Sequence, residues 1–148
     1  MPSLTEPFRL HHQHCDDLFI GAENAVKRKD WSLARRELSA FLAAMEAHFG
    51  AEEEMLFPAF EAATGMSGGP TQVMRHEHAQ MRNLFEQMQT ALDGQDAAAY
   101  ASAADTLLVL MQQHNMKEEN ILYPMCNQRL EAQAATLGPA LHARLETA

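Results

Sequence analysis

Two copies of one pattern, H-x3-E-E-x2-L-aromatic-P, lie 66 residues apart in this chain of 148 residues. One copy runs from His48 to Pro58 and the other from His114 to Pro124. On an α-helix, residues four positions apart lie on one face, about one turn from each other. Each copy therefore presents an imidazole and a carboxylate in the same direction. This arrangement predicts two helices that direct these groups at one interior point.

The remaining sequence favours an all-α, up-down-up-down four-helix bundle with a short C-terminal helical tail. Long stretches are rich in Ala, Leu, Met, Gln and Glu, and the runs of Val, Ile, Thr and Tyr that are typical of strands are absent. The length suits a single domain, 1–148. Residues that break or cap helices divide it into two helical hairpins, at about 5–63 and 71–129, and a tail at 130–148.

Particular residues set the expected helix ends. Asp30 is expected to cap the second helix, and the turn at 93–96 is expected to end in a second cap, at Asp96. Pro58 and Pro124 each lack a backbone N–H, so each is expected to kink or end its helix just past the glutamates. Gly138 and Pro139 are expected to set off the C-terminal tail.

The charge of the chain excludes several classes of partner. Asp and Glu number 20 against 11 Lys and Arg, which gives a formal net charge of −9. Such a surface repels phosphate backbones and anionic lipids, so no nucleic acid or membrane partner is expected. No apolar run approaches the ~18 residues of a membrane span. Two cysteines, Cys15 and Cys126, make no disulfide framework, and a cytoplasmic protein is expected.

The hairpin geometry selects histidines that lie at one height. Residues equidistant from the turn of an antiparallel helix pair lie level with each other. His78 and His114 are equidistant from Asp96, and His14 and His48 are equidistant from Trp31. Each of these histidines lies about 25 Å from its turn.

The face of the first helix leaves a choice between histidines. His78 falls in an apolar stripe of the third helix. The correspondence between the first and third helices matches His14 to His78 and therefore selects His14. His11 remains a rival, and His12 fits worst. A further pair, His142 and Glu146, has the same spacing but lies in a tail that can fray, so we interpret it as unrelated.

These residues predict a metal site with six ligands: His14, His48, Glu52, His78, His114 and Glu118. Burying such groups unpaired would cost several kcal/mol each, and a metal removes that cost. Glu53 and Glu119 point about 140° away from the histidine of their repeat. They are expected either at the surface or as acceptors for an imidazole N–H, and whether Glu119 joins Glu118 at the metal is left open. Tyr123 is expected to pack on the opposite face from His114.

The combination of His14, H48-x3-E52, His78 and H114-x3-E118 resembles the hemerythrin-like (HHE) cation-binding domains. The resemblance implies two Fe ions joined by carboxylates and an oxo or hydroxo group, with the four histidines as terminal ligands and Glu52 and Glu118 as bridges. Zn or Mn also suits such donors. Oxygen-carrying hemerythrins have a histidine where this chain has Met74, and their last pair is H-x4-D. The chain looks instead like bacterial domains implicated in iron–sulfur repair and nitrosative stress.

Three functions follow as hypotheses. The first is a di-iron protein that binds or senses O2, NO or peroxide, or supplies iron under oxidative or nitrosative stress. The second is a low-turnover di-iron oxidoreductase that reduces peroxide or NO, so whether the chain is an enzyme is left open. The third is a metal-free helical interaction module. The expected partner is a small diatomic ligand or peroxide. The sequence names no protein partner and leaves a homodimer open.

Overall fold

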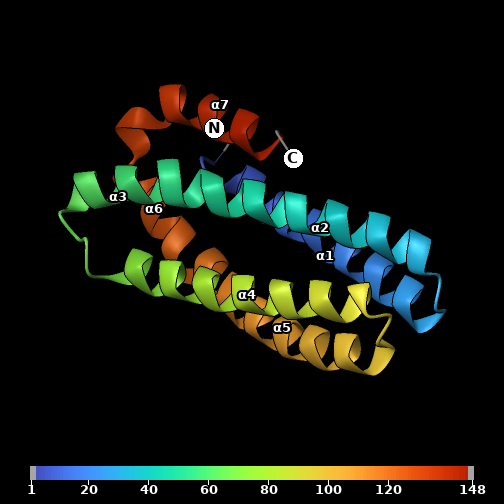
Figure 1. The fold of residues 1–148 in the computed structure, drawn as a ribbon. Helices are drawn as coiled ribbons and strands as arrows, with labels where there is room; N and C mark the ends of the chain where they lie inside the picture. The colour runs from blue at the N-terminus through green and yellow to red at the C-terminus, as the bar shows by residue number, and fades with distance from the viewer. Residues whose placement is uncertain (1–2, 147–148) are drawn as a thin grey trace.

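The computed structural model describes residues 3–146, and within this range it contains helices and no strand. Four long helices form two antiparallel hairpins that pack along each other (Figure 1). The long helices are α1 (Glu6–Lys27), α2 (Trp31–Ala51), α4 (Pro70–Asp93) and α5 (Ala97–Lys117). Both hairpin turns lie at one end of the molecule, and the link between the hairpins lies at the other. The predicted up-down-up-down bundle is confirmed.

The two hairpin turns have the same construction. Lys29 and Gln95 adopt positive φ angles of 58° and 52°, and an aspartate follows each. The Asp30 carboxylate accepts the backbone N–H of Leu33 at 3.2 Å, and Asp96 accepts that of Ala99 at 3.0 Å. Both aspartates cap the next helix, as predicted, because they satisfy one of its free N–H groups.

The two prolines do not end their helices. α2 passes through a π-helical turn, η1 (Glu52–Leu56), into α3 (Phe57–Thr64), and α5 passes through η2 (Glu118–Leu122) into α6 (Tyr123–Arg129). The backbone N–H of Phe57 donates to the carbonyl of Glu52, and that of Tyr123 to the carbonyl of Glu118. A π turn contains one extra residue, so the side chains after it are rotated by about 100° relative to an uninterrupted α-helix.

The C-terminal segment is a packed helix. After the short η3 (Glu131–Gln133), α7 (Ala134–Leu145) lies along α2 (Figure 1). Leu141 and Leu145 are buried in the same apolar cluster as Phe57 and Phe60. Pro139 lies inside α7, so the expectation that it sets off the tail was wrong.

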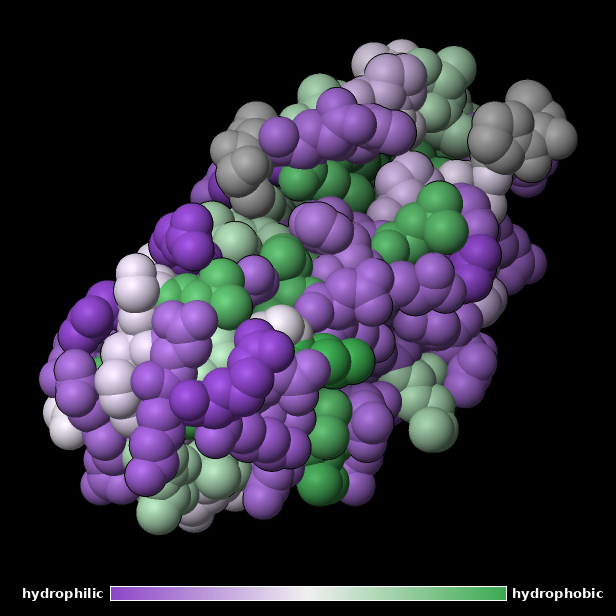
Figure 2. All heavy atoms as spheres, turned by 90° about the vertical axis from the view of Figure 1, so that its right-hand side faces the viewer, coloured by the Kyte–Doolittle hydropathy of each residue, from purple (hydrophilic) through white to green (hydrophobic). Residues whose placement is uncertain are grey.

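The surface combines polar residues with separate apolar groups. Figure 2 shows mainly hydrophilic residues on the face that carries the hairpin turns, with hydrophobic residues scattered between them. Among residues 3–146, each helix is too short or too polar to cross a membrane. His142 and Glu146 form an exposed pair on α7, consistent with our interpretation that they are unrelated to the site.

Candidate metal centre

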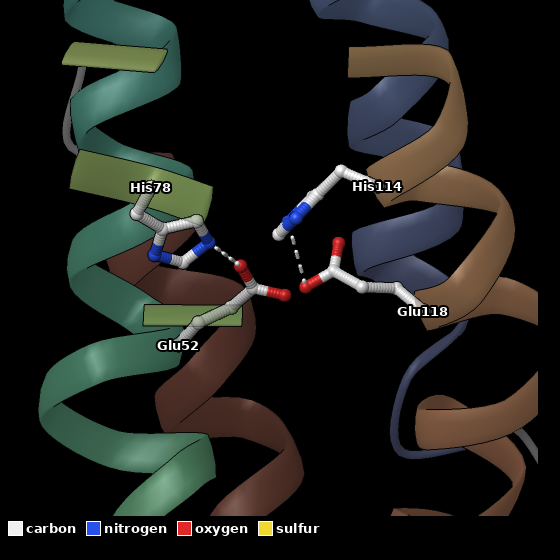
Figure 3. A group of neighbouring side chains, drawn as sticks. All are labelled: Glu52, His78, His114 and Glu118. Carbon is white, nitrogen blue, oxygen red and sulfur yellow. Dashed lines mark ion pairs between the residues drawn. The ribbon is translucent and has the colours of Figure 1, made fainter. Parts of the chain in front are cut away.

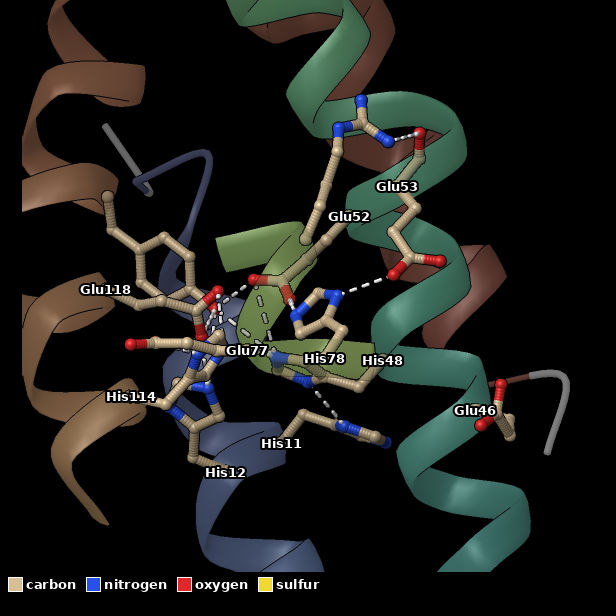
Figure 4. Close-up of polar contacts among 12 residues, drawn as sticks. His11, His12, Glu46, His48, Glu52, Glu53, Glu77, His78, His114 and Glu118 are labelled. Atoms are coloured by element: carbon tan, nitrogen blue, oxygen red, sulfur yellow. Dashed lines mark hydrogen bonds and ion pairs between the residues drawn. The ribbon is translucent and has the colours of Figure 1, made fainter. Parts of the chain in front are cut away.

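Six imidazole and carboxylate side chains meet in the interior of the bundle. They come from all four long helices and from the first residue of each π turn, and each residue is at most 5% exposed. Figure 4 shows their polar contacts, with the helices around them. The six residues are His12, His48, Glu52, His78, His114 and Glu118.

One group of donors consists of Glu52, His78, His114 and Glu118, which point toward one another from two sides (Figure 3). One ligand atom from each lies within 4.8 Å of all the others. Nε2 of His78 lies 3.1 Å from Oε1 of Glu52, and Nε2 of His114 lies 3.4 Å from Oε2 of Glu118. Ligands bound at about 2.1 Å lie at most about 4.2 Å apart across a metal, so small shifts would let all four reach one ion.

These same four atoms have no hydrogen-bond partner. Buried polar atoms in proteins are nearly always paired, and an unpaired one costs about 1–3 kcal/mol. Four ligand atoms that lack a hydrogen-bond partner and face one point indicate a cation site. The residues present therefore fit a metal ion.

A second group of donors lies beside the first. Nε2 of His12 lies 3.1 Å from Oε1 of Glu118, and Nε2 of His48 lies 3.9 Å from the same oxygen. Nε2 of His48 also lies 3.6 Å from Oε2 of Glu52. Two imidazoles and two carboxylate oxygens thus surround a second position.

Each glutamate directs one oxygen to each group. Glu52 offers Oε1 to His78 and Oε2 to His48, whereas Glu118 offers Oε2 to His114 and Oε1 to His12. The π turns contribute to this arrangement, because both glutamates are the first residue of such a turn. A carboxylate with one oxygen toward each of two positions has the geometry needed to join two cations.

The electrostatics of the metal-free site also favour a cation. Burial opposes the charged form of Glu52, yet His48, Glu118 and His78 hold its pKa well below the ordinary value. Burial likewise opposes a charged His114, but the carboxylates of Glu118, Glu52 and Glu77 outweigh it and raise its pKa to about 9. Protonated imidazoles thus compensate the buried carboxylates. A metal ion would replace those protons.

Three of the histidines each contact, through Nδ1, a different carboxylate that lies outside the two groups. Nδ1 of His78 lies 2.7 Å from Glu53, and Nδ1 of His12 lies 2.6 Å from Glu119. In a neutral imidazole, an Nδ1–H donated to a carboxylate leaves the lone pair on Nε2, the atom that faces the site. Of the two roles expected for Glu53 and Glu119, the structure therefore supports that of imidazole acceptor.

Glu77 has the same role for His114, at 2.8 Å, and it was not recognised in the sequence. Lys117 donates to the other oxygen of Glu77 at 2.5 Å. Arg82 holds Glu53 similarly, with two contacts of 2.9 and 3.0 Å. These cations keep the outer carboxylates charged and in place.

His48 differs from the other three histidines. Its Nδ1 lies 3.0 Å from Nδ1 of His11, and the two rings stack at 5.1 Å. Burial, and then the neighbouring His48, lower the pKa of His11 to about 3, so His11 is neutral. His11, the rival candidate on the first helix, therefore contacts a donor but belongs to neither group.

The choice of His14 needs correction. Its side chain is exposed, and His12, which seemed to fit worst, lies in the second group. On α1 the buried face includes Phe8, His12, Cys15 and Phe19, and His14 falls outside it. The signal was present in the repeat, because His78 follows His12 by 66 residues, the same step that separates His114 from His48.

Tyr123 also has a different place from the one expected. Its hydroxyl lies 2.7 Å from Oε2 of Glu52 and 3.0 Å from Oε1 of Glu118. The expectation assumed an uninterrupted α-helix, and the extra residue of the π turn η2 rotates Tyr123 into the site. Burial, together with Glu118 and Glu52, raises the pKa of Tyr123, so the phenol keeps its proton in the metal-free protein.

Aromatic side chains enclose the site. The Phe49 ring stacks on His78 with centroids 3.9 Å apart, and the Phe8 ring meets His48 edge-on at 5.3 Å. These contacts fix the imidazole orientations and keep bulk water away.

Comparisons with known proteins agree with this geometry. The model of the hemerythrin HHE cation binding domain family matches residues 3–126. The chain is also similar to the iron-sulfur cluster repair protein YtfE of Musicola paradisiaca (strain Ech703), with 31% identity over 140 residues. That alignment covers 84% of this chain, and the chain spans 63% of the relative's length. No solved structure matches at a significant level.

Proposed function

Because the chain belongs to the hemerythrin HHE cation-binding family, we propose that its six converging side chains hold two iron ions. In this proposal, His78 and His114 bind one ion, and His12 and His48 bind the other. Glu52 and Glu118 bridge them. The protein uses this centre under oxidative or nitrosative stress, either to bind or sense O2, NO or peroxide, or to supply iron for repair.

The division of the carboxylate oxygens is the observation that carries the proposal. A single cation would need one oxygen from each glutamate, whereas here both oxygens of each glutamate face imidazoles. The donor set, with four imidazoles and two carboxylates, suits iron, and also zinc or manganese. Two bound irons would supply redox chemistry and coordination positions for a small ligand.

The relative supports the stress role. It is named as an iron-sulfur cluster repair protein, and its similarity covers most of this chain. The burial of the site fits a small uncharged ligand such as NO or O2 better than an ionic substrate. Iron delivery would require the bundle to open, because both glutamates are fully buried.

Titration of the iron-loaded protein tests the proposal. Anaerobic protein with reduced iron would be titrated with NO, with O2 and with peroxide while its optical spectrum is followed. We expect a spectral change that saturates at about one ligand per di-iron centre. His78→Ala should abolish this change and His76→Ala, an exposed histidine on the same helix, should preserve it, because only His78 lies in a donor group.

Two further readouts separate the alternatives. Product that accumulates over many turnovers would identify the oxidoreductase instead of a binder or sensor. Iron transfer is measured by mixing the loaded protein with a protein whose iron–sulfur cluster has been damaged, and by following recovery of the cluster absorbance. A protein that takes up no metal, and whose stability is unchanged by His48→Ala, would be the metal-free interaction module.

A further inference from the structure

The hydroxyl of Tyr123 touches all four donor atoms of the second group. Besides the contacts with Glu52 and Glu118, it lies 3.3 Å from Nε2 of His48 and 3.4 Å from Nε2 of His12. A phenol has one proton, so it can satisfy only one of these atoms at a time. The other three contacts of the hydroxyl oxygen therefore need either protons on the histidines or a cation that these atoms share.

The spacing of these atoms matches neighbouring ligands around one metal. Two ligands held at about 2.1 Å from an ion lie about 3.0 Å apart at a right angle and about 3.4 Å apart at a tetrahedral angle. The Tyr123 oxygen lies between 2.7 and 3.4 Å from the four donors. The Tyr123 oxygen therefore lies at the distance expected of a fifth ligand. An oxygen at the metal position itself would lie about 2.1 Å from the four donor atoms.

The repeat shows that the Tyr123 hydroxyl has no counterpart in the other half of the site. Phe57 occupies the position that corresponds to Tyr123, 66 residues earlier, and it also follows a π turn. The Phe57 ring lies nearly parallel to His78 at 5.9 Å, as the Tyr123 ring does to His12 at 5.8 Å. The two halves thus place equivalent rings beside equivalent histidines, and only the second ring has a hydroxyl.

We propose that Tyr123 is a direct ligand, through its phenolate oxygen, of the iron held by His12 and His48. This inference rests on the proposed function, because it needs an ion at that position. When the ion binds, the phenol O–H bond breaks, the proton leaves to solvent, and the freed electron pair of the oxygen forms the bond to iron. The charge of a bound cation drives such a proton loss.

The two iron positions are then unequal. The position of His12 and His48 receives two imidazoles, two carboxylate oxygens and the phenolate. The position of His78 and His114 receives two imidazoles and two carboxylate oxygens, with Phe57 beside it in place of a phenol. The small exogenous ligand therefore binds at the His78 and His114 position, which has the greater number of open coordination sites.

The optical spectrum of the iron-loaded protein tests this assignment. Phenolate bound to ferric iron has an intense charge-transfer band in the visible range, and Raman scattering excited within it shows enhanced tyrosinate ring modes. The apoprotein would be loaded with ferrous iron, exposed to air, and measured together with Tyr123→Phe and Tyr100→Phe. Tyr100, the other tyrosine, is equally buried but lies about 21 Å along α5 from His114.

We expect the band and the ring modes in the wild type and in Tyr100→Phe, and their loss in Tyr123→Phe. Their absence from wild-type protein that holds about two irons would overturn the assignment and leave the proposed function intact. A band that survives in Tyr123→Phe would also overturn it. Protein that takes up no iron would overturn both proposals. If Tyr123→Phe does not fold, the Raman spectrum of the wild type alone decides.

Discussion

The Nδ1 atom of His12 lies 2.6 Å from Oε2 of Glu119, so a residue of the second hairpin holds a histidine of the first. The reverse contact also exists, because Glu53 of the first hairpin holds His78 of the second at 2.7 Å. The second glutamate of each E-E pair therefore orients a histidine across the bundle. These two contacts help to keep the hairpins in register around the site.

Replacement of His12 should remove one metal position. His12→Ala deletes an imidazole from the second group, and we expect metal content to fall from about two ions per chain toward about one. His14→Ala is the matched control, because it deletes an exposed histidine on the same helix. Metal analysis after anaerobic purification measures both. Equal metal loss in the two variants would contradict the assignment of His12.

Loss of an outer carboxylate should weaken metal binding without removing a ligand. Glu53→Gln takes the charged acceptor from His78 and from Arg82. Such changes typically lower metal affinity by about 10- to 100-fold. Competition with a chelator measures the affinity. Glu54→Gln, an exposed neighbour, should leave it unchanged, and a similar loss in both variants would show that general charge, not orientation of His78, is responsible.

The stability of the metal-free protein should fall as pH rises from about 6.5 to 9. The pKa of His114 is raised to about 9, and those of His12 and His78 are also raised, because nearby carboxylates outweigh burial. A histidine whose folded pKa is raised stabilises the protein fully below its unfolded pKa of about 6.5, and this contribution disappears as pH passes the folded value. For His114 it is on the order of 3 kcal/mol.

Urea unfolding of chelator-treated protein across this pH range checks the sign. Burial lowers the pKa values of His48 and His11, so these two histidines change the stability only below about pH 6.5 and do not mask the trend. The metal-loaded protein is the control, and its stability should change less, because its imidazoles have already lost their protons. A metal-free protein that gains stability toward pH 9 would contradict the description of the site.

The C-terminal helix should contribute to stability. Leu141 of α7 is fully buried, and truncation of such a side chain typically costs about 2–5 kcal/mol. We expect Leu141→Ala to lower the free energy of unfolding by this amount in urea titrations. Leu10→Ala removes the same atoms from a side chain that is 52% exposed and should change it by less than about 0.5 kcal/mol. Near-equal effects would mean that α7 is not docked in solution.

Much of the fold could be predicted from the sequence. The helix periodicity, the two aspartate caps and the loop before Pro70 are local signals, and each determined an element end within a few residues. Four of the six converging residues lie in the two H-x3-E motifs, where the helix geometry alone aligns them. His78 followed from the apolar face of its helix.

The remaining site residues depend on features that local patterns describe poorly. His12 and His14 are two positions apart, about 200° around α1, so they have nearly the same height in the hairpin but point to nearly opposite faces. The hairpin count gives the height, and the packing of α1 on its neighbours decides which of the two histidines points inward. Tyr123 enters the site through a π turn, and a count of 100° per residue does not anticipate the extra residue. Glu77 reaches His114 from the neighbouring helix, and only the packing of α4 on α5 reveals that contact.

Metal analysis of protein purified without oxygen tests the central claim most directly. Two donor groups that share Glu52 and Glu118 predict about two irons per chain, and the His48→Ala variant should retain about one. Protein that contains no metal, or a single zinc, and that does not take up two irons when they are supplied, would contradict the account.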